Sequence, residues 1–171
     1  MSLSMYQASI PVFINQLNDL SGILKKAEEH AIAKKIEQDV FINARLAPDM
    51  FPLSRQVQIA SDGVKGCAAR LAGVEVPSYP DTEKTFVELQ ARIEKTIAFL
   101  KTFSAAQIDG SEERKVVLKL RGQDTTFLGQ PYLLGFVFPN LYFHVSMAYA
   151  ILRHNGVDIG KRDFLAHLNL S

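Results

Sequence analysis

Apolar side chains recur every three or four positions along most of this 171-residue chain, the spacing of an amphipathic helix. Four long segments follow this pattern: residues 4–33, residues 52–72, a stretch from Asp81 to about Phe103, and residues 131–154. Proline removes a backbone donor, so we expect a kink or a fresh start at Pro11 in the first segment. Asp81 is placed to cap the third segment, while Asp49 precedes the second segment as a capping or pre-helix residue and Gly73 ends it.

Shorter elements lie between and after the long helices. A short helix is expected over residues 35–43, and a last one over residues 161–168. KVVLKL and TTFL, separated by RGQD, predict a β-hairpin before the fourth long helix. Pro131 opens that helix and Pro139 is expected to kink it. The chain therefore predicts one all-α domain over residues 1–171. Its expected fold is an antiparallel four-helix bundle with a β-hairpin inserted between helices 3 and 4 and a short C-terminal helix.

Charge and cysteine content narrow the possible partners and location. Lys and Arg number 19 against 18 for Asp and Glu, a net charge of +1, so no nucleic-acid partner is expected. A single cysteine, Cys67, excludes an internal disulfide and is expected to be a buried, inert thiol. The N-terminus lacks a basic region followed by a long apolar run. We therefore expect a cytoplasmic protein.

Residues 130–152 contain no formally charged side chain and are long enough to cross a bilayer. Two interpretations follow, a membrane span or a bundle helix that is covered on nearly every side. Pro139, Asn140 and His144 make a heavy polar load for a lone span, so no membrane partner is expected. A helix this apolar needs more cover than three neighbours usually provide, which predicts a homodimer.

Few side chains stand out as candidates for chemistry. The four histidines are His30, His144, His154 and His167, and no two are three or four residues apart. His144 lies in the apolar fourth helix and is either a hydrogen-bonded core residue or a metal ligand. His154 is expected at a helix C-terminus, where a positive charge suits the helix dipole. No role is assigned to His30 or His167.

Polar residues around the second helix form a second set of candidates. Arg45 and Asp49 are four residues apart and are expected to form a salt bridge that shapes their turn; alternatively, Arg45 grips an anion. Gln56 and Gln58 point to different sides of the helix, and we expect Gln58 to face His144. Asp62 is four residues after Gln58 and shares its face.

Sequence signals of several common enzyme classes are missing. Gly160 and Lys161 lack the spacing of a phosphate-binding loop. No GxGxxG, GxSxG or CxxC motif occurs, so the usual dinucleotide, hydrolase and thiol-redox signals are absent.

Three blocks resemble a known superfamily over essentially the whole chain. SMYQASIPVF, RLAPDMFPLSRQVQIA, and PNLYFHVSMAYAILRHNG with GKRDFL are similar to the DinB-like, also called YfiT-like, four-helix bundles. More narrowly, the chain resembles a bacterial domain-of-unknown-function family within that superfamily. The resemblance implies three histidine ligands in metal-binding members, one on the second helix and an HxxxH pair on the fourth. It also implies nickel or zinc serving thiol-dependent transferases, isomerases and hydrolases.

The ligand positions that this resemblance implies are largely lost in the present chain. The first falls on Gln58, the second on His144 and the third on Ala148. One histidine with a glutamine supplies too few donors for zinc or nickel. Asp62 and Asp49 are the nearest carboxylates that would have to substitute.

Two functional interpretations remain beside the membrane-associated one. In the first, the protein is a cytosolic DinB-like bundle with no cofactor and an incomplete metal site. It binds a small molecule between the second and fourth helices, with Arg45, Asp49, Gln58, Asp62 and His144 as candidate contacts. In the second, it is a divergent nickel- or zinc-dependent thiol-transferase or hydrolase. His144 and Gln58 are then the catalytic candidates, with His144 as metal ligand or general base.

Overall fold

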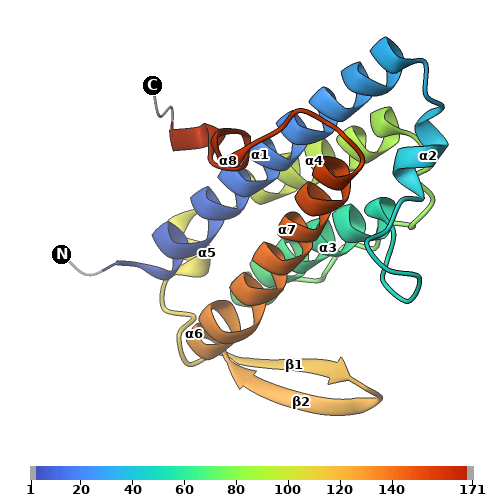
Figure 1. Cartoon of the computed structure of the whole chain (residues 1–171). Coiled ribbons are helices and arrows are strands. Elements are labelled where there is room, and N and C mark those ends of the chain that lie inside the picture. The colour runs from blue at the N-terminus through green and yellow to red at the C-terminus, as the bar shows by residue number, and fades with distance from the viewer. Residues whose placement is uncertain (1–2, 169–171) are drawn as a thin grey trace.

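Four long helices build the bundle in the computed structural model, which describes residues 3–168. They are α1 (Met5–Lys34), α3 (Leu53–Ala72), α4 (Phe86–Leu100) and α7 (Phe138–His154) (Figure 1). Strands β1 (Lys115–Leu120) and β2 (Gln123–Leu128) pair antiparallel between α4 and α7, and this hairpin projects from one end of the bundle. The shorter helices are α2 (Gln38–Ile42), α5 (Ala105–Ile108), α6 (Gly129–Pro131) and α8 (Lys161–Phe164). The predicted fold class is confirmed.

The apolar stripes predicted along the helices form the core. Every member of the α3 stripe is completely buried: Leu53, Val57, Ala60, Val64, Cys67, Ala68 and Leu71. In α4 the stripe is also buried, and it continues past the end of the helix to Phe103. Burial of such side chains is the main favourable free energy of folding, about 1.5–3 kcal/mol for each large one.

Helices α3 and α7 run antiparallel and pack closely against each other. Gln56 contacts His144 near one end of the pair, and Arg70 reaches the hydroxyl of Tyr132 at the other. Between them, a Cβ at Gly63 would lie 3.5 Å from the side-chain nitrogen of Asn140. That distance is ordinary van der Waals contact, so α3 and α7 touch at this point, with His144 opposite α3.

The cap of α4 differs from the prediction. Thr85, rather than Asp81, is the N-cap: its side chain accepts from the amide of Glu88 at 3.1 Å. The Glu88 carboxylate in turn accepts from the amide of Thr85 at 3.0 Å. This reciprocal pair satisfies two amides that the first helical turn leaves open. Asp81 lies four residues earlier and forms ion pairs instead.

The structure shows how two helices accommodate the prolines at which a kink or a fresh start was expected. Helix α1 runs through Pro11 as one element, so no fresh start occurs there. Pro139 lies in the first turn of α7, and the irregularity precedes it as a π-helical turn, Tyr132–Val137. Because Pro139 has no amide hydrogen, the turn before it lacks one α-helical bond, which suits a wider turn.

His167, to which the sequence assigned no role, anchors the end of the described chain. It belongs to a 3-10 turn, Ala166–Leu168, and its Nδ1 lies 2.5 Å from Oδ2 of Asp19 in α1. The His167 amide also donates to Oδ1 of Asp19 at 2.9 Å. Asp19 is 3% exposed, whereas the side chain of His167 is 22% exposed, so the histidine covers a buried carboxylate.

The continuous helical stretch Gly129–His154 is long and apolar enough to cross a bilayer. Its inner side packs on α3 and α1, so it is an integral part of the bundle. The bundle has the core of a soluble domain. Only 33% of its most apolar window is buried, and Leu134, Tyr142 and Phe143 remain 41–52% exposed. The predicted homodimer would cover this side; it stays a prediction.

Replacing Gly129 with alanine tests the junction between the hairpin and α6. A Cβ there would lie 1.9 Å from the carbonyl oxygen of Ser111, so backbone must move. We expect Gly129→Ala to lower the free energy of unfolding by about 2 kcal/mol or more. Gly135→Ala is the control, because no atom lies within 4 Å of its added Cβ. Equal urea midpoints for the two variants would contradict the close contact.

Candidate functional site

His144 and Gln56 form a buried pair between α7 and α3. Nδ1 of His144 lies 2.7 Å from Oε1 of Gln56, and Nε2 of Gln56 donates to the carbonyl of Phe51 at 3.1 Å. An amide oxygen only accepts, so Nδ1 carries the proton and Nε2 of the imidazole keeps its lone pair. No hydrogen bond among residues 3–168 uses Nε2 of His144.

Gln58 does not face His144, so that prediction is wrong. Its Nε2 donates to Oε2 of Glu83 at 3.0 Å, and its Oε1 accepts from Arg55 at 3.3 Å. Two residues along a helix turn the side chain to the other side. Gln56 precedes Gly63 by seven residues and so shares the face that receives α7. That spacing was the sequence signal for the correct glutamine.

The imidazole of His144 is neutral at physiological pH. Burial and, to a smaller extent, the positive charge of Arg55 lower the pKa of His144 to about 4. The side chain is 7% exposed, which accounts for the desolvation. His144 therefore offers a hydrogen-bond acceptor rather than a positive charge.

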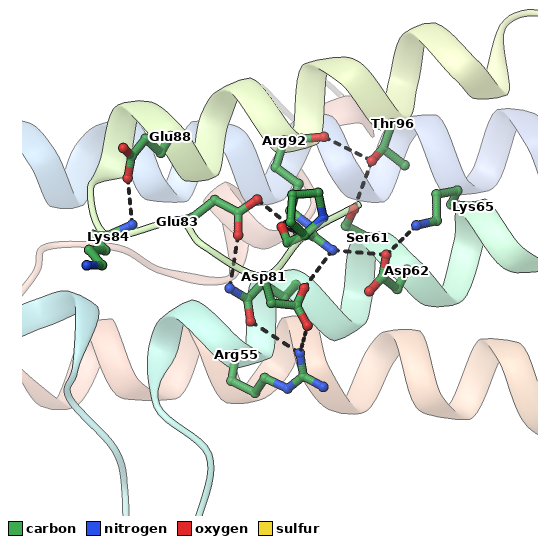
Figure 2. A network of polar contacts seen from close by, with 12 residues as sticks. Arg55, Ser61, Asp62, Lys65, Asp81, Glu83, Lys84, Glu88, Arg92 and Thr96 are labelled. Atoms are coloured by element: carbon green, nitrogen blue, oxygen red, sulfur yellow. Dashed lines mark hydrogen bonds and ion pairs between the residues drawn. The ribbon is translucent and has the colours of Figure 1, made fainter. Parts of the chain in front are cut away.

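A buried arginine lies at the centre of a polar network between α3, α4 and the segment that joins them (Figure 2). The side chain of Arg92 is 2% exposed; its Nη2 lies 3.0 Å from Oδ1 of both Asp62 and Asp81. Its Nη1 lies 2.8 Å from Glu83 and donates to the carbonyl of Pro80 at 3.0 Å. A buried guanidinium is tolerated only with such partners.

Two further cations complete this Arg92 network. Lys65 pairs with Asp62 at 2.6 Å, and Arg55 pairs with Asp81 (Figure 2). Three cations thus alternate with three carboxylates, so the network is balanced in charge. It holds the segment 74–85 across α3 and α4, and it places Arg55 near His144.

Arg92 was missed by the sequence analysis, although a weak signal existed. It follows the buried Leu89 by three residues and precedes the buried Thr96 by four. A charged residue on the border of an apolar stripe is ordinarily solvated. Its burial depends on carboxylates from distant segments, which helical spacing does not reveal.

The remaining candidates lie apart from His144. Arg45 and Asp49 are exposed in the turn before α3, and Arg45 contacts the carbonyls of Pro48 and Met50 at 3.5 and 3.4 Å. The expected salt bridge between Arg45 and Asp49 is wrong, since none of the ion pairs in the described chain joins them. Asp49 does not cap α3 either, because the residue at that position is Pro52.

The donors around His144 do not make a metal site of the usual kind. Gln58 turns away, Ala148 has no donor, and Asp62 is held by Arg92 and Lys65. Within residues 3–168, no group of three His, Cys, Asp or Glu side chains is arranged to hold a metal ion. Cys67 is completely buried, and burial raises the pKa of its thiol.

The helical bundle has the architecture that the resemblance to DinB-like proteins predicted. The chain belongs to the family described as Domain of unknown function (DUF1993), whose model matches residues 5–165. It is similar to a crystal structure of a DinB family member protein from Shewanella denitrificans, with 41% identity and a TM-score of 0.88. The match covers 94% of this chain and 90% of that one. No curated protein matches. The resemblance predicted from the three sequence blocks is confirmed.

The lowered pKa of His144 predicts a pH dependence of stability. The unfolded chain, with an ordinary pKa of 6.5, binds more protons than the folded chain between pH 6.5 and 4. The free energy of unfolding therefore falls as the pH drops through this window, by up to about 3 kcal/mol from this residue. His144→Asn keeps a donor for Gln56 without the titration.

Urea denaturation across this pH window measures the effect. The decrease in unfolding free energy on acidification should be smaller in His144→Asn than in the unmodified protein. His154→Asn, an exposed histidine on the same helix, should leave the decrease unchanged. Parallel pH profiles for all three proteins would show that His144 titrates normally.

Proposed function

We propose that this DinB-like protein binds a small polar molecule at His144, between α3 and α7, without a metal ion. The observation that supports the proposal is the imidazole itself. It is held by Gln56 at Nδ1, kept neutral by burial, and has no protein partner at Nε2 among the described residues. Nε2 of His144 is not among the fully buried side-chain atoms that lack a partner, so water or a donor group of a ligand can reach it.

The surroundings of His144 define the chemistry that the ligand should have. Nε2 accepts from an O–H or N–H group, so the ligand carries a donor. Arg55 pairs with Asp81 through Nη1, and its remaining guanidinium N–H groups lie near His144 and favour a ligand that also has an acidic group. The ring of Phe51, 55% exposed and 6.0 Å from the Arg55 guanidinium, offers an apolar surface beside them. A hydroxylated aromatic acid combines these three features.

A metal-dependent transferase or hydrolase is the second candidate. One observation favours it: metal-ligating histidines ordinarily donate their other ring nitrogen to an oxygen, as Nδ1 of His144 does to Gln56. His144 would then be a ligand or a general base. The weakness of this candidate is the donor set, since one histidine alone holds nickel or zinc poorly.

The probe for the first proposal is 4-hydroxybenzoate, which has both a donor and a carboxylate. We expect it to shift the ¹⁵N resonance of His144 Nε2, and benzoate, which lacks the donor, to bind several-fold more weakly. His144→Phe should abolish binding, while His154→Phe, on the same helix, should retain it.

Elemental analysis of the purified protein tests the alternative, a metal-dependent enzyme. About one nickel or zinc per chain that is lost only in His144→Phe would favour the metal-dependent enzyme.

We also propose that the protein is cytoplasmic and forms a homodimer through the outer side of α7 and the preceding turn. The single buried cysteine supports the cytoplasmic location. The exposed Leu134 and Tyr142, which lie on a stretch without charged residues, support the dimer. Burial of such a patch stabilises association in proportion to its apolar area.

Light scattering on a sizing column tests the dimer. The unmodified protein should have twice the 19.0 kDa mass of one chain. Leu134→Glu should shift it to a single chain, because the added carboxylate would be buried in the interface. Val87→Glu, at an exposed apolar position on α4, should leave the dimer intact. A monomeric unmodified protein would rule the proposal out.

A further inference from the structure

A cleft lies between α4 and the segment 79–83, and His144 is not among the residues that line it. It has a volume of about 280 Å³. Tyr79, Pro80 and Ala91 form much of its apolar wall, and Glu88 and Lys95 of α4 also line it. This volume is close to the lower limit of ordinary ligand sites and suits a small molecule.

The walls of this cleft are held in place by the Arg92 network. Arg92 donates to the carbonyl of Pro80 at 3.0 Å and pairs with Glu83 at 2.8 Å. The ring of Tyr79 lies 3.9 Å from the ammonium of Lys65. A cleft that is preformed in this way loses little conformational freedom when it binds a ligand.

Lys95 and Glu88 are oppositely charged residues of the cleft, and each can form a further ion pair. Lys95 contacts the ring of Tyr79 at 4.1 Å and belongs to none of the ion pairs between described residues. Glu88 uses one oxygen, Oε2, to accept from the amides of Lys84 and Thr85, and no described hydrogen bond uses its Oε1. Glu83, in contrast, has both oxygens engaged, by Arg92 and Gln58.

The two charges are spaced along one face of α4. Seven residues separate Glu88 from Lys95, which places them on the same side of the helix and about 10 Å apart along its axis. Ala91 lies between them and faces Pro80 across the cleft. The cleft therefore presents a negative end, an apolar middle and a positive end.

We infer that this cleft binds a small extended zwitterion, whose ammonium group pairs with Glu88 and whose carboxylate pairs with Lys95. An ω-amino acid and a short peptide with free termini share this chemistry. An α-amino acid with an uncharged side chain does not, because its ammonium and carboxylate groups are attached to the same carbon and cannot reach both ends of the cleft. The site requires neither His144 nor a metal ion.

Titration of the full chain with 6-aminohexanoate, followed by amide NMR, tests the inference. We expect saturable shifts at Thr82 and Ala91 at millimolar probe concentrations. Hexanoate lacks the ammonium group, hexylamine lacks the carboxylate, and glycine lacks the distance between the two charges. Each should bind at least about tenfold more weakly than 6-aminohexanoate. Triglycine is the peptide arm: binding as tight as that of 6-aminohexanoate would favour a peptide as the natural ligand, and weaker binding an ω-amino acid.

Two conservative variants assign the charges. Lys95→Met keeps the aliphatic stem, and Glu88→Gln keeps a residue that can complete the helix cap. Each should weaken 6-aminohexanoate binding at least about tenfold. Lys101→Met, at the exposed end of α4, is the matched control and should bind normally. Unchanged binding in both cleft variants, or no saturable shifts with either zwitterion, would overturn the inference.

Discussion

A buried guanidinium sets the arrangement of α3, α4 and the segment between them. Arg92 is almost completely removed from water, and its charge is compensated only because Asp62, Asp81 and Glu83 converge on it. Removing one partner from such a group ordinarily costs about 3–5 kcal/mol, since a buried charge is left uncompensated. Helices α3 and α4 and the segment between them are therefore bound to one another as a unit.

Both candidate binding sites lie at the borders of that unit. On one side, Asp81 holds Arg55, whose charge reaches His144. On the other, Pro80 and Tyr79 are fixed above α4 and leave the cleft that Lys95 lines. The same ion pairs thus hold Arg55 near His144 and the segment 79–83 against α4.

Helix positions and core stripes were predictable from the sequence because both depend on local spacing and on a large burial free energy. The predictions that failed concern polar side chains. Asp81 has a suitable side chain for a cap, but Thr85 competes with it and has Glu88 three residues later. The partner of His167 lies 148 residues away and the farthest partner of Arg92 lies 30 residues away, and no periodic pattern records such pairs.

The position of His144 shows how a single turn can control a distant contact. The π-helical turn Tyr132–Val137 accommodates more residues per turn than the α-helix that follows it. Loss of one residue within this turn would convert it to an ordinary α-helical turn. Loss of one residue between Pro139 and His144 would instead rotate the imidazole by about 100° about the helix axis, away from Gln56. Insertions and deletions among relatives should therefore occur in this turn. A change of length there alters the connection to the hairpin without rotating His144 away from Gln56.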